Sequence, residues 1–285
     1  MLAILLDGLA FGLQLSMLAV GLTLIYGLGG VLNLAHGQFA TAGAIVGSLV
    51  IANGYGLVAG LVSILVFTGV LALVADLTIM RPVYKLTGER RVLLSLLVTL
   101  GLGFAIDGWL FANYAADSLN LSVPGPVINI LGVGMRRNAV AAAVIAIASL
   151  AALILFLRYT RLGKAVRSII QDEEGARLVG VNPTMVRTLV FIVSGMLAGL
   201  FAIAEGFNSS VGPDRARLFT ILALIVTVVG GLGSVSGALV AGLVLGVIFV
   251  SSQFFLGGFV TFVILLLTAI TIILVKPSGI LGKAH

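Results

Sequence analysis

Long apolar runs alternate with short polar connections along the whole chain. A helix needs about 20 consecutive apolar residues to cross the hydrocarbon core of a bilayer. The pattern therefore predicts an all-α, polytopic integral membrane protein with about eight transmembrane helices, built as a single transmembrane domain over residues 1–285. The apolar runs are 9–28, 35–52, 57–79, 92–112, 139–157, 188–204, 219–229 with 238–250, and 259–275.

Glycine-rich segments interrupt the apolar pattern once in each half of the chain, as GLGGVLNLAHG at 27–37 and as GGLGSVSG at 230–237. Backbone groups freed by such breaks survive at membrane depth only where they line a cavity or are buried in protein. Paired interruptions of this kind are typical of binding sites in transporters. We therefore expect a translocation pathway along these residues: Asn33, His36, Gln38, Gly230, Gly231 and Gly233. As an alternative, Asn33 and His36 only cap the broken helix.

The second interruption also raises a question of topology. The region 219–253 begins on the outer side and has to return there before the last apolar run. The chain therefore either crosses the membrane twice on short helices or dips in and turns back. The sequence leaves both paths open.

One long polar segment, residues 160–187, separates two apolar runs, and we call it the knob. Ala165, Ile169 and Ala176 fall near one face at helical spacing, which predicts a surface helix. Gly180 is expected to end it, and Asn182 followed by proline is expected to cap a new helix. We expect the knob to dock into a partner protein. The alternative is a basic loop that only fixes orientation.

Charge is scarce, and its placement predicts the orientation of the chain. Hydrophobic residues make up 60% of the sequence and charged residues 9%, with a net charge of +6. The positive-inside rule accounts for this charge, so no nucleic-acid partner is expected. Three basic regions are expected to be cytoplasmic: Arg81 with Lys85, Arg90 and Arg91; 158–187; and Lys276 with Lys283. The connection 113–138 should lie outside, although Arg136 and Arg137 are exceptions to the rule.

A few acidic residues lie within the apolar runs: Asp107, Glu205 and, near a cytoplasmic end, Asp76. Ionisable groups inside a membrane cost several kcal/mol and are functional candidates by default. Asp107 and Glu205 fall toward the outer ends of their runs, where water reaches side chains. We therefore expect interfacial solvation to account for both of them, which argues against a proton relay.

Motifs of enzymes are missing from the sequence. HExxH, GxSxG and GxxxxGK[ST] are absent, and with no cysteine there is no thiolate metal site. The sequence therefore predicts no catalytic residues, no metal site and no cofactor in this chain. If the chain belongs to an ATP-driven pump, the ATPase must be a different chain.

Several segments together resemble one family. Glu174-Gly175-Ala176 with Gly180-Val181-Asn182 resembles the ATPase-coupling loop of permease subunits in ABC importers. NLAHG at 33–37, GGLGSVSGALVAG at 230–242 and LVKPSGILG at 274–282 are similar to further signatures of LivH-like permeases of branched-chain amino acid importers. Gln38 departs from this family, which often has an acidic residue directly after the glycine.

The resemblance implies a multi-pass permease subunit of the bacterial inner membrane that forms half of a translocation pathway. It implies three kinds of partner besides lipid: a second, LivM-like permease, two cytoplasmic ATPase subunits that hold ATP and Mg, and a periplasmic or lipid-anchored binding protein. The coupling residues would be Asp172, Glu173, Glu174, Ala176, Gly180 and Asn182. Branched-chain amino acids are the expected cargo, but relatives for urea, short amides or aromatic acids look alike.

Two other classes of function compete with this interpretation. A stand-alone, ion-coupled secondary transporter or channel would also suit the interrupted helices. The scarcity of carboxylates in the spans and the presence of the knob weigh against it. For a structural membrane scaffold, changes in the glycine interruptions would affect assembly without any effect on cargo flux.

Overall fold

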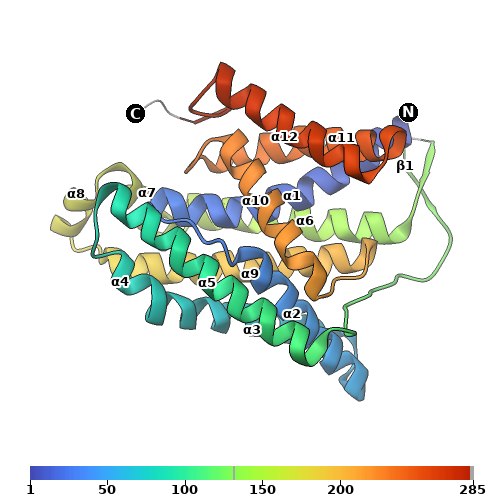
Figure 1. The fold of residues 1–285 in the computed structure, drawn as a ribbon, viewed down its shortest axis with the longest axis horizontal. Coiled ribbons are helices and arrows are strands. Elements are labelled where there is room, and N and C mark those ends of the chain that lie inside the picture. The colour runs from blue at the N-terminus through green and yellow to red at the C-terminus, as the bar shows by residue number, and fades with distance from the viewer. Residues whose placement is uncertain (131, 283–285) are drawn as a thin grey trace.

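The computed structural model describes residues 1–130 and 132–282, and nearly all of the regular structure is helical (Figure 1). Lys283 of the expected basic C-terminus lies outside the described residues. The α-helices are α1 Leu2–Gly29, α2 His36–Val50, α3 Leu57–Ala75, α4 Arg81–Val83, α5 Gly88–Tyr114, α6 Arg137–Tyr159, α7 Arg161–Gln171, α8 Glu173–Leu178, α9 Pro183–Asn208, α10 Ala216–Gly230, α11 Val235–Leu256 and α12 Gly258–Val275. The helical turns are η1 Ile51–Tyr55, η2 Asp76–Met80 and η3 Pro213–Arg215. A small antiparallel hairpin joins β1 Ile128–Ile130 to β2 Val133–Met135, with Ile128 opposite Met135.

Within the described residues, seven helices are long and apolar enough to cross a membrane. They contain α1, α3, α5, α6, α9, α11 and α12. The α-helices α2 and α10 have 15 residues each, a length of about 22 Å, whereas the hydrocarbon core is about 30 Å thick. The expected all-α, polytopic fold is confirmed, and the two short helices are those that follow or precede the glycine interruptions.

The helices α1 and α9 form the centre of the bundle, and their residues are mostly buried. In Figure 1, α11 and α12 lie on one side of this centre and α3 with α5 on the other. The outer helices expose apolar side chains at helical spacing, such as Val62, Val66 and Val70 on α3. Exposed valine and leucine in such rows fit contact with lipid chains rather than water.

Small residues allow α1 and α11 to lie unusually close together. A Cβ atom at Gly12 would come within 2.8 Å of the carbonyl oxygen of Gly242, so a side chain there has no room. The Ser16 hydroxyl donates to the Leu239 carbonyl across the same contact at 3.0 Å. Close approach through glycine and a hydroxyl bond between helices are the usual means of packing helices in membranes.

The path of residues 219–253 differs from both alternatives, because it combines a short helix, α10, with a helix long enough to cross, α11. Gly246 packs on Gly12 near the start of α1, whereas Gly233 packs on Gly27 near its end, so α11 runs antiparallel to α1. The helix α10 runs the other way and ends beside the turn at 231–234. The chain therefore passes along the bundle twice. Only α10 is short, because α11 has 22 residues.

Candidate functional site

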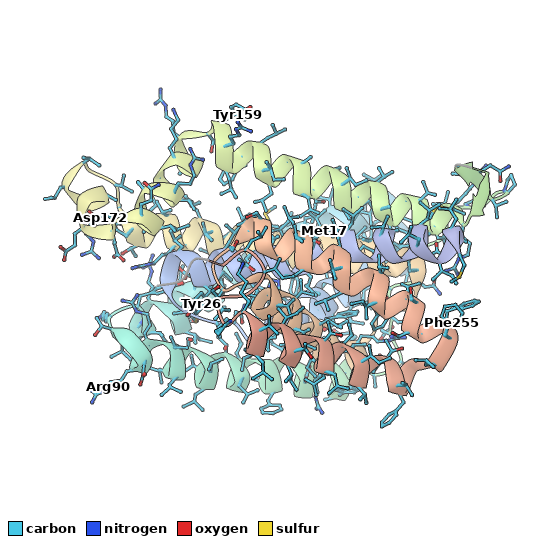
Figure 2. The ribbon with its side chains drawn as sticks, turned by 90° about the horizontal axis from the view of Figure 1, so that it is seen from above. Met17, Tyr26, Arg90, Tyr159, Asp172 and Phe255 are labelled. Atoms are coloured by element: carbon cyan, nitrogen blue, oxygen red, sulfur yellow. The ribbon has the colours of Figure 1, made fainter. Side chains whose placement is uncertain are left out.

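The knob lies at one end of the bundle and comprises α7, α8 and the start of α9. Figure 2 shows Asp172 and Arg90 at this end, which we call the knob end, and Phe255 at the opposite end, which we call the far end. Gly180 has the left-handed φ of +87° expected for a helix stop. Asn182 Oδ1 accepts a hydrogen bond of 3.2 Å from the Met185 N–H, with Pro183 at the first position of α9. Both predictions for this turn are confirmed.

The expected single helix through Ala165 and Ala176 is wrong, because the chain breaks at Asp172. This residue has an extended backbone, with φ of −156° and ψ of 107°. Its Oδ1 atom accepts a hydrogen bond of 3.0 Å from the Glu174 N–H, so Asp172 is the N-cap of α8. Aspartate is among the residues most favoured at this position. The apolar spacing continued across the break and concealed it.

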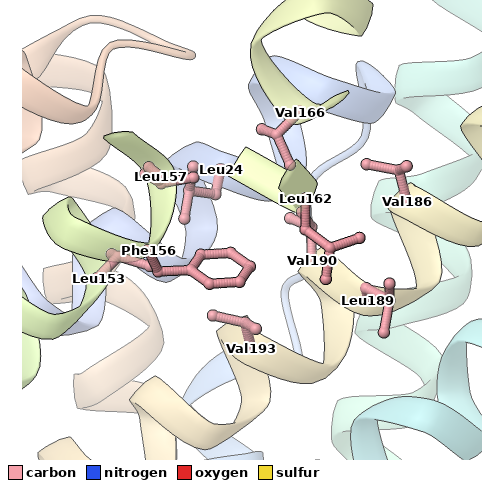
Figure 3. Close-up of a pocket in the computed structure, with 10 residues that line it drawn as sticks. All are labelled: Leu24, Leu153, Phe156, Leu157, Leu162, Val166, Val186, Leu189, Val190 and Val193. Carbon is pink, nitrogen blue, oxygen red and sulfur yellow. The ribbon is translucent and has the colours of Figure 1, made fainter. Parts of the chain in front are cut away.

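A set of ten apolar side chains, which we call the seat, packs the first helix of the knob, α7, against the bundle (Figure 3). Leu162 and Val166 of α7 point toward side chains of α6, α9 and α1. The space left between them is about 10 Å³, and its walls are apolar. A water needs polar partners as well as room, so this space stays dry. The helix α7 is therefore packed into the bundle. The other side chains of the seat are Leu24, Leu153, Phe156, Leu157, Val186, Leu189, Val190 and Val193.

The tip of the knob faces outward and is partly apolar. Leu178 is 89% exposed and Val179 is 77% exposed. Asp172, Glu174 and Asn182, which flank these two residues in the sequence, are also exposed. Two other predicted coupling residues face inward, since Ala176 is buried and Glu173 forms ion pairs within the protein.

Arg187, the last residue of the knob, is a buried arginine. Its side chain is 5% exposed, and its guanidinium pairs with Glu173 of α8 at 2.5 Å. It also lies over the ring of Tyr84, 5.2 Å from the ring centre, and donates to the Leu28 carbonyl at 3.4 Å. Arg187 thus connects the knob with the end of α1 and with the connection after α4.

Further polar groups surround this arginine. The Tyr84 hydroxyl donates to Asp76 Oδ1 at 3.3 Å, and the Thr188 hydroxyl donates to Asp76 Oδ2 at 2.6 Å. Burial, followed by the charge of Asp76, raises the pKa of Tyr84 far above its usual range, so the phenol stays neutral. Asp76 could be flagged from the sequence as an ionisable residue in an apolar run. Arg187 could not, because it lies in a segment rich in basic residues.

At the first interruption, α1 ends and the chain returns into the bundle through a non-helical segment, residues 31–35. Hydroxyl groups of α5 accept the freed backbone N–H groups, at 3.1 Å for Leu32 on Ser95 and at 3.0 Å for Leu34 on Thr99. Asn33 Oδ1 accepts the N–H of Ala35 at 3.0 Å. The backbone groups are therefore buried in protein and satisfied there, one of the two conditions under which such a break survives.

The polar side chains of this interruption are all buried. The Nε2 atom of His36 lies 3.1 Å from the Leu18 carbonyl of α1. Gln38 donates to Asp107 Oδ2 at 3.3 Å and accepts from the Thr220 hydroxyl at 3.2 Å. Asn33 replaces a missing backbone partner, as the capping alternative expects, whereas His36 and Gln38 connect α2 with other helices.

The expectation that water solvates Asp107 and Glu205 is wrong. Asp107 is 3% exposed, and its Oδ2 atom accepts from Gln38 and, at 3.3 Å, from Arg217. Glu205 is 8% exposed and accepts the Ser209 hydroxyl at 2.6 Å through Oε1. Neighbouring helices cover both carboxylates laterally, which their position near the ends of their own helices does not reveal.

The second interruption packs against the C-terminal segment. The N–H groups of Ile280 and Leu281 donate to the carbonyls of Val229 and Gly230, at 2.8 and 3.2 Å. Gly231 has a φ of +103°, and a Cβ atom there would lie 2.6 Å from the Ser278 carbonyl oxygen. The segment 274–282 thus caps the carbonyl end of α10.

A cavity opens at each end of the bundle. The inner cavity, at the knob end, has a volume of about 1250 Å³ and is lined by Arg158, Arg167, Gly233 and Ser236 among others. The outer cavity, at the far end, has a volume of about 460 Å³. Residues of α1 and α11 line both of them. Of the six residues expected along the pathway, Gly233 lines the inner cavity. The other five are not among the described residues that line either cavity.

A family model decides the classification. Residues 4–275 match the family described as the permease component of branched-chain amino acid transport systems. The chain belongs to this permease family. It is 27% identical over 295 residues to the high-affinity branched-chain amino acid transport system permease protein LivH of Escherichia coli (strain K12), covering 97% of this chain and 94% of LivH. It is 26% identical to the LivM permease of the same system and strain, covering 93% of this chain and 67% of LivM.

The fold is similar to that of a solved structure. PsaBC from Streptococcus pneumoniae in complex with Fab superposes with a TM-score of 0.50 at 15% sequence identity, covering 94% of this chain and 89% of that chain. This permease family consists of transport subunits of ABC importers and not of enzymes, and ATP hydrolysis belongs to a separate subunit. As a permease of this family, the chain is a multi-pass membrane protein that works in a permease pair.

Proposed function

We propose that this permease forms half of the translocation pathway for branched-chain amino acids in an ABC importer of the bacterial inner membrane. One observation carries the proposal: the knob exposes an apolar tip while its base is packed into the transmembrane helices. The likeness to LivH supports the cargo. The complete importer would add a LivM-like permease, two cytoplasmic ATPase subunits that hold ATP and Mg, and a periplasmic or lipid-anchored binding protein.

The tip of the knob is the docking element of this proposal. Exposed apolar side chains rimmed by polar ones mark protein interaction sites, and Leu178 and Val179 have polar neighbours of this kind. Asp172, Gly180 and Asn182 shape the tip through their caps and turn, and Glu174 adds charge to it. Glu173 and Ala176 face the bundle, so they would transmit the movement of the docked tip.

The two cavities are the two mouths of the pathway. Both are lined by α1 and α11, so a shift of these helices against their neighbours would close one mouth and open the other. Asn33, His36 and Gln38 hold the first break, and Gly230, Gly231 and Gly233 form the second. We propose that these breaks are the moving parts of the pathway, with Gly233 on its surface.

Docking is tested by replacing Leu178 with aspartate. Burial of an apolar side chain contributes about 1.5–3 kcal/mol, so Leu178→Asp should reduce ATPase binding about tenfold or more and abolish ATP-driven leucine uptake. Copurification of tagged ATPase subunits and uptake into proteoliposomes measure the two effects.

Tyr55→Asp provides the control, because Tyr55 is 74% exposed and belongs to η1, outside the knob. This variant should bind ATPase and transport leucine like the wild type. Leu178→Met should also retain both activities. If Leu178→Asp bound ATPase normally and transported leucine normally, the docking proposal would be refuted.

A further inference from the structure

The outer cavity carries charges of both signs on its walls. Asp7 and Glu205 supply carboxylates, and Arg136 and Arg215 supply guanidinium groups. These four residues come from α1, α9, the cap of α6 and η3, so the fold brings them together from distant parts of the chain. The inner cavity differs, because its described lining residues include Arg158 and Arg167 but no carboxylate.

Glu205 is the one among these four groups that is buried and has a polar atom left unpaired by the described residues. Its side chain is 8% exposed, and the Ser209 hydroxyl occupies only Oε1. The buried Oε2 atom has no hydrogen-bond partner in the part of the chain that the structure describes. Leaving a buried acceptor unpaired is costly, and more so when it is charged. The residue lines the cavity, so a cation bound there would supply the missing partner.

Arg215 is placed to bind the other end of such a ligand. It lines the same outer cavity as Glu205. Its ion pair with Asp214 measures 3.6 Å, and the Asp214 side chain is 71% exposed, so this pair is weak. The guanidinium therefore remains available for a carboxylate, which it can bind through two parallel hydrogen bonds.

Phenyl rings form part of the remaining wall of the cavity. The rings of Phe201 and Phe219 meet edge to face, with centroids 4.8 Å apart, and Phe249 contacts Phe11 at the same centroid distance. All four residues line the outer cavity. Rings of this kind bury apolar surface well. The cavity thus combines an acceptor for a cation, a donor for an anion and an apolar wall.

We propose that the outer cavity is a subsite for the zwitterionic head and apolar side chain of an α-amino acid. This inference rests on the proposed function and makes it more specific. The ammonium group binds Glu205 Oε2, the carboxylate binds Arg215, and the aliphatic side chain contacts the phenyl rings. Urea and short amides carry no charge and would leave both ionic groups unpaired, so the subsite selects against them.

The test is ATP-driven uptake of leucine by the complete importer in proteoliposomes, measured against the concentration of leucine-loaded binding protein. Glu205→Gln keeps the shape of the side chain and removes its charge. It should lower the maximal uptake rate at least about tenfold, as expected from the loss of one charge-assisted hydrogen bond. Arg215→Gln should have a similar effect, and Arg215→Lys should restore part of the rate.

Asp117→Asn is the matched control, because it removes an acidic charge from the connection at the same end, outside the cavity lining. It should transport leucine at the wild-type rate. Copurification of the ATPase subunits with each variant shows that the complex has assembled.

Two results would overturn the subsite. In one, the Glu205 and Arg215 variants match Asp117→Asn while the wild type transports leucine, so the proposed function stands without the subsite. In the other, excess binding protein restores the maximal leucine uptake rate of the Glu205 and Arg215 variants. The two charges would then serve the docking of the binding protein. A wild-type importer that never accumulates leucine would instead refute the proposed cargo itself.

Discussion

At the scale of single residues, Arg187 makes the strongest connection between the knob and the bundle. Its guanidinium joins Glu173 of α8 to the Leu28 carbonyl at the end of α1 and covers the ring of Tyr84. Arginine suits this position because its planar group can pair with a carboxylate and stack on a ring at the same time. A movement of α8 would therefore reach the first broken helix through one side chain.

Arg187→Ala should uncouple ATP hydrolysis from leucine uptake in the importer. The variant removes a buried partner of Glu173 and of the Leu28 carbonyl, which costs about 1–3 kcal/mol of folding stability. We expect ATP hydrolysis to continue while leucine uptake falls, since the docked knob no longer transmits its movement. Both rates are measured on the same proteoliposomes.

Arg177→Ala is the control for that variant. Arg177 pairs with the same Glu173 at 2.6 Å, but its side chain is 60% exposed. Exposed ion pairs contribute about 0–1 kcal/mol, so the control should stay coupled. If Arg187→Ala transported leucine with the wild-type ratio of uptake to hydrolysis, Arg187 would have no part in transmission.

At the scale of elements, α1 and α11 line both cavities, and the contact between these two helices depends on glycine. A Cβ atom at Gly246 would overlap the Cα atom of Gly12, and neither backbone can yield without separating the helices. Overpacking of a close contact costs about 1–3 kcal/mol. The two helices therefore move together or not at all, which makes them a stiff wall for the pathway.

Gly246→Ala should lower the thermal unfolding temperature of the purified permease, and Gly101→Ala should not. Gly101 lies within α5, and a Cβ atom there meets nothing within 4 Å. Both changes exchange glycine for alanine inside a helix, so the difference between them reports the helix contact alone. Equal unfolding temperatures of the two variants would show that the contact between α1 and α11 can accommodate a methyl group.

Elements were the part of the structure that the sequence predicted best. The apolar run 139–157 lies inside α6, and the stop at Gly180 and the cap at Asn182 are found as expected, because these features depend on neighbouring residues. The break at Asp172 was missed, since the apolar spacing runs across it. The burial of Asp107 was missed because its partner Arg217 is 110 residues away. A partner so distant in the sequence cannot be recognised from the pattern of neighbouring residues.

At the scale of the whole molecule, the bundle joins a docking tip at one end to a cavity with charges of both signs at the other. The knob is seated on α6, α9 and α1, and α1 also lines both cavities. A force applied to the tip by another protein would thus act on the helix that borders the whole pathway. The central claim is that this force comes from an ATPase on a separate chain.

Leucine uptake into proteoliposomes tests this claim most directly, with binding protein and an ion gradient supplied in every sample. The permease pair alone is compared with the pair joined to its ATPase subunits, with ATP present on the knob side and a protonophore added or omitted. We predict uptake only with both ATPase and ATP, and no effect of the protonophore. Uptake by the permease pair alone, driven by the ion gradient and abolished by the protonophore, would contradict the account.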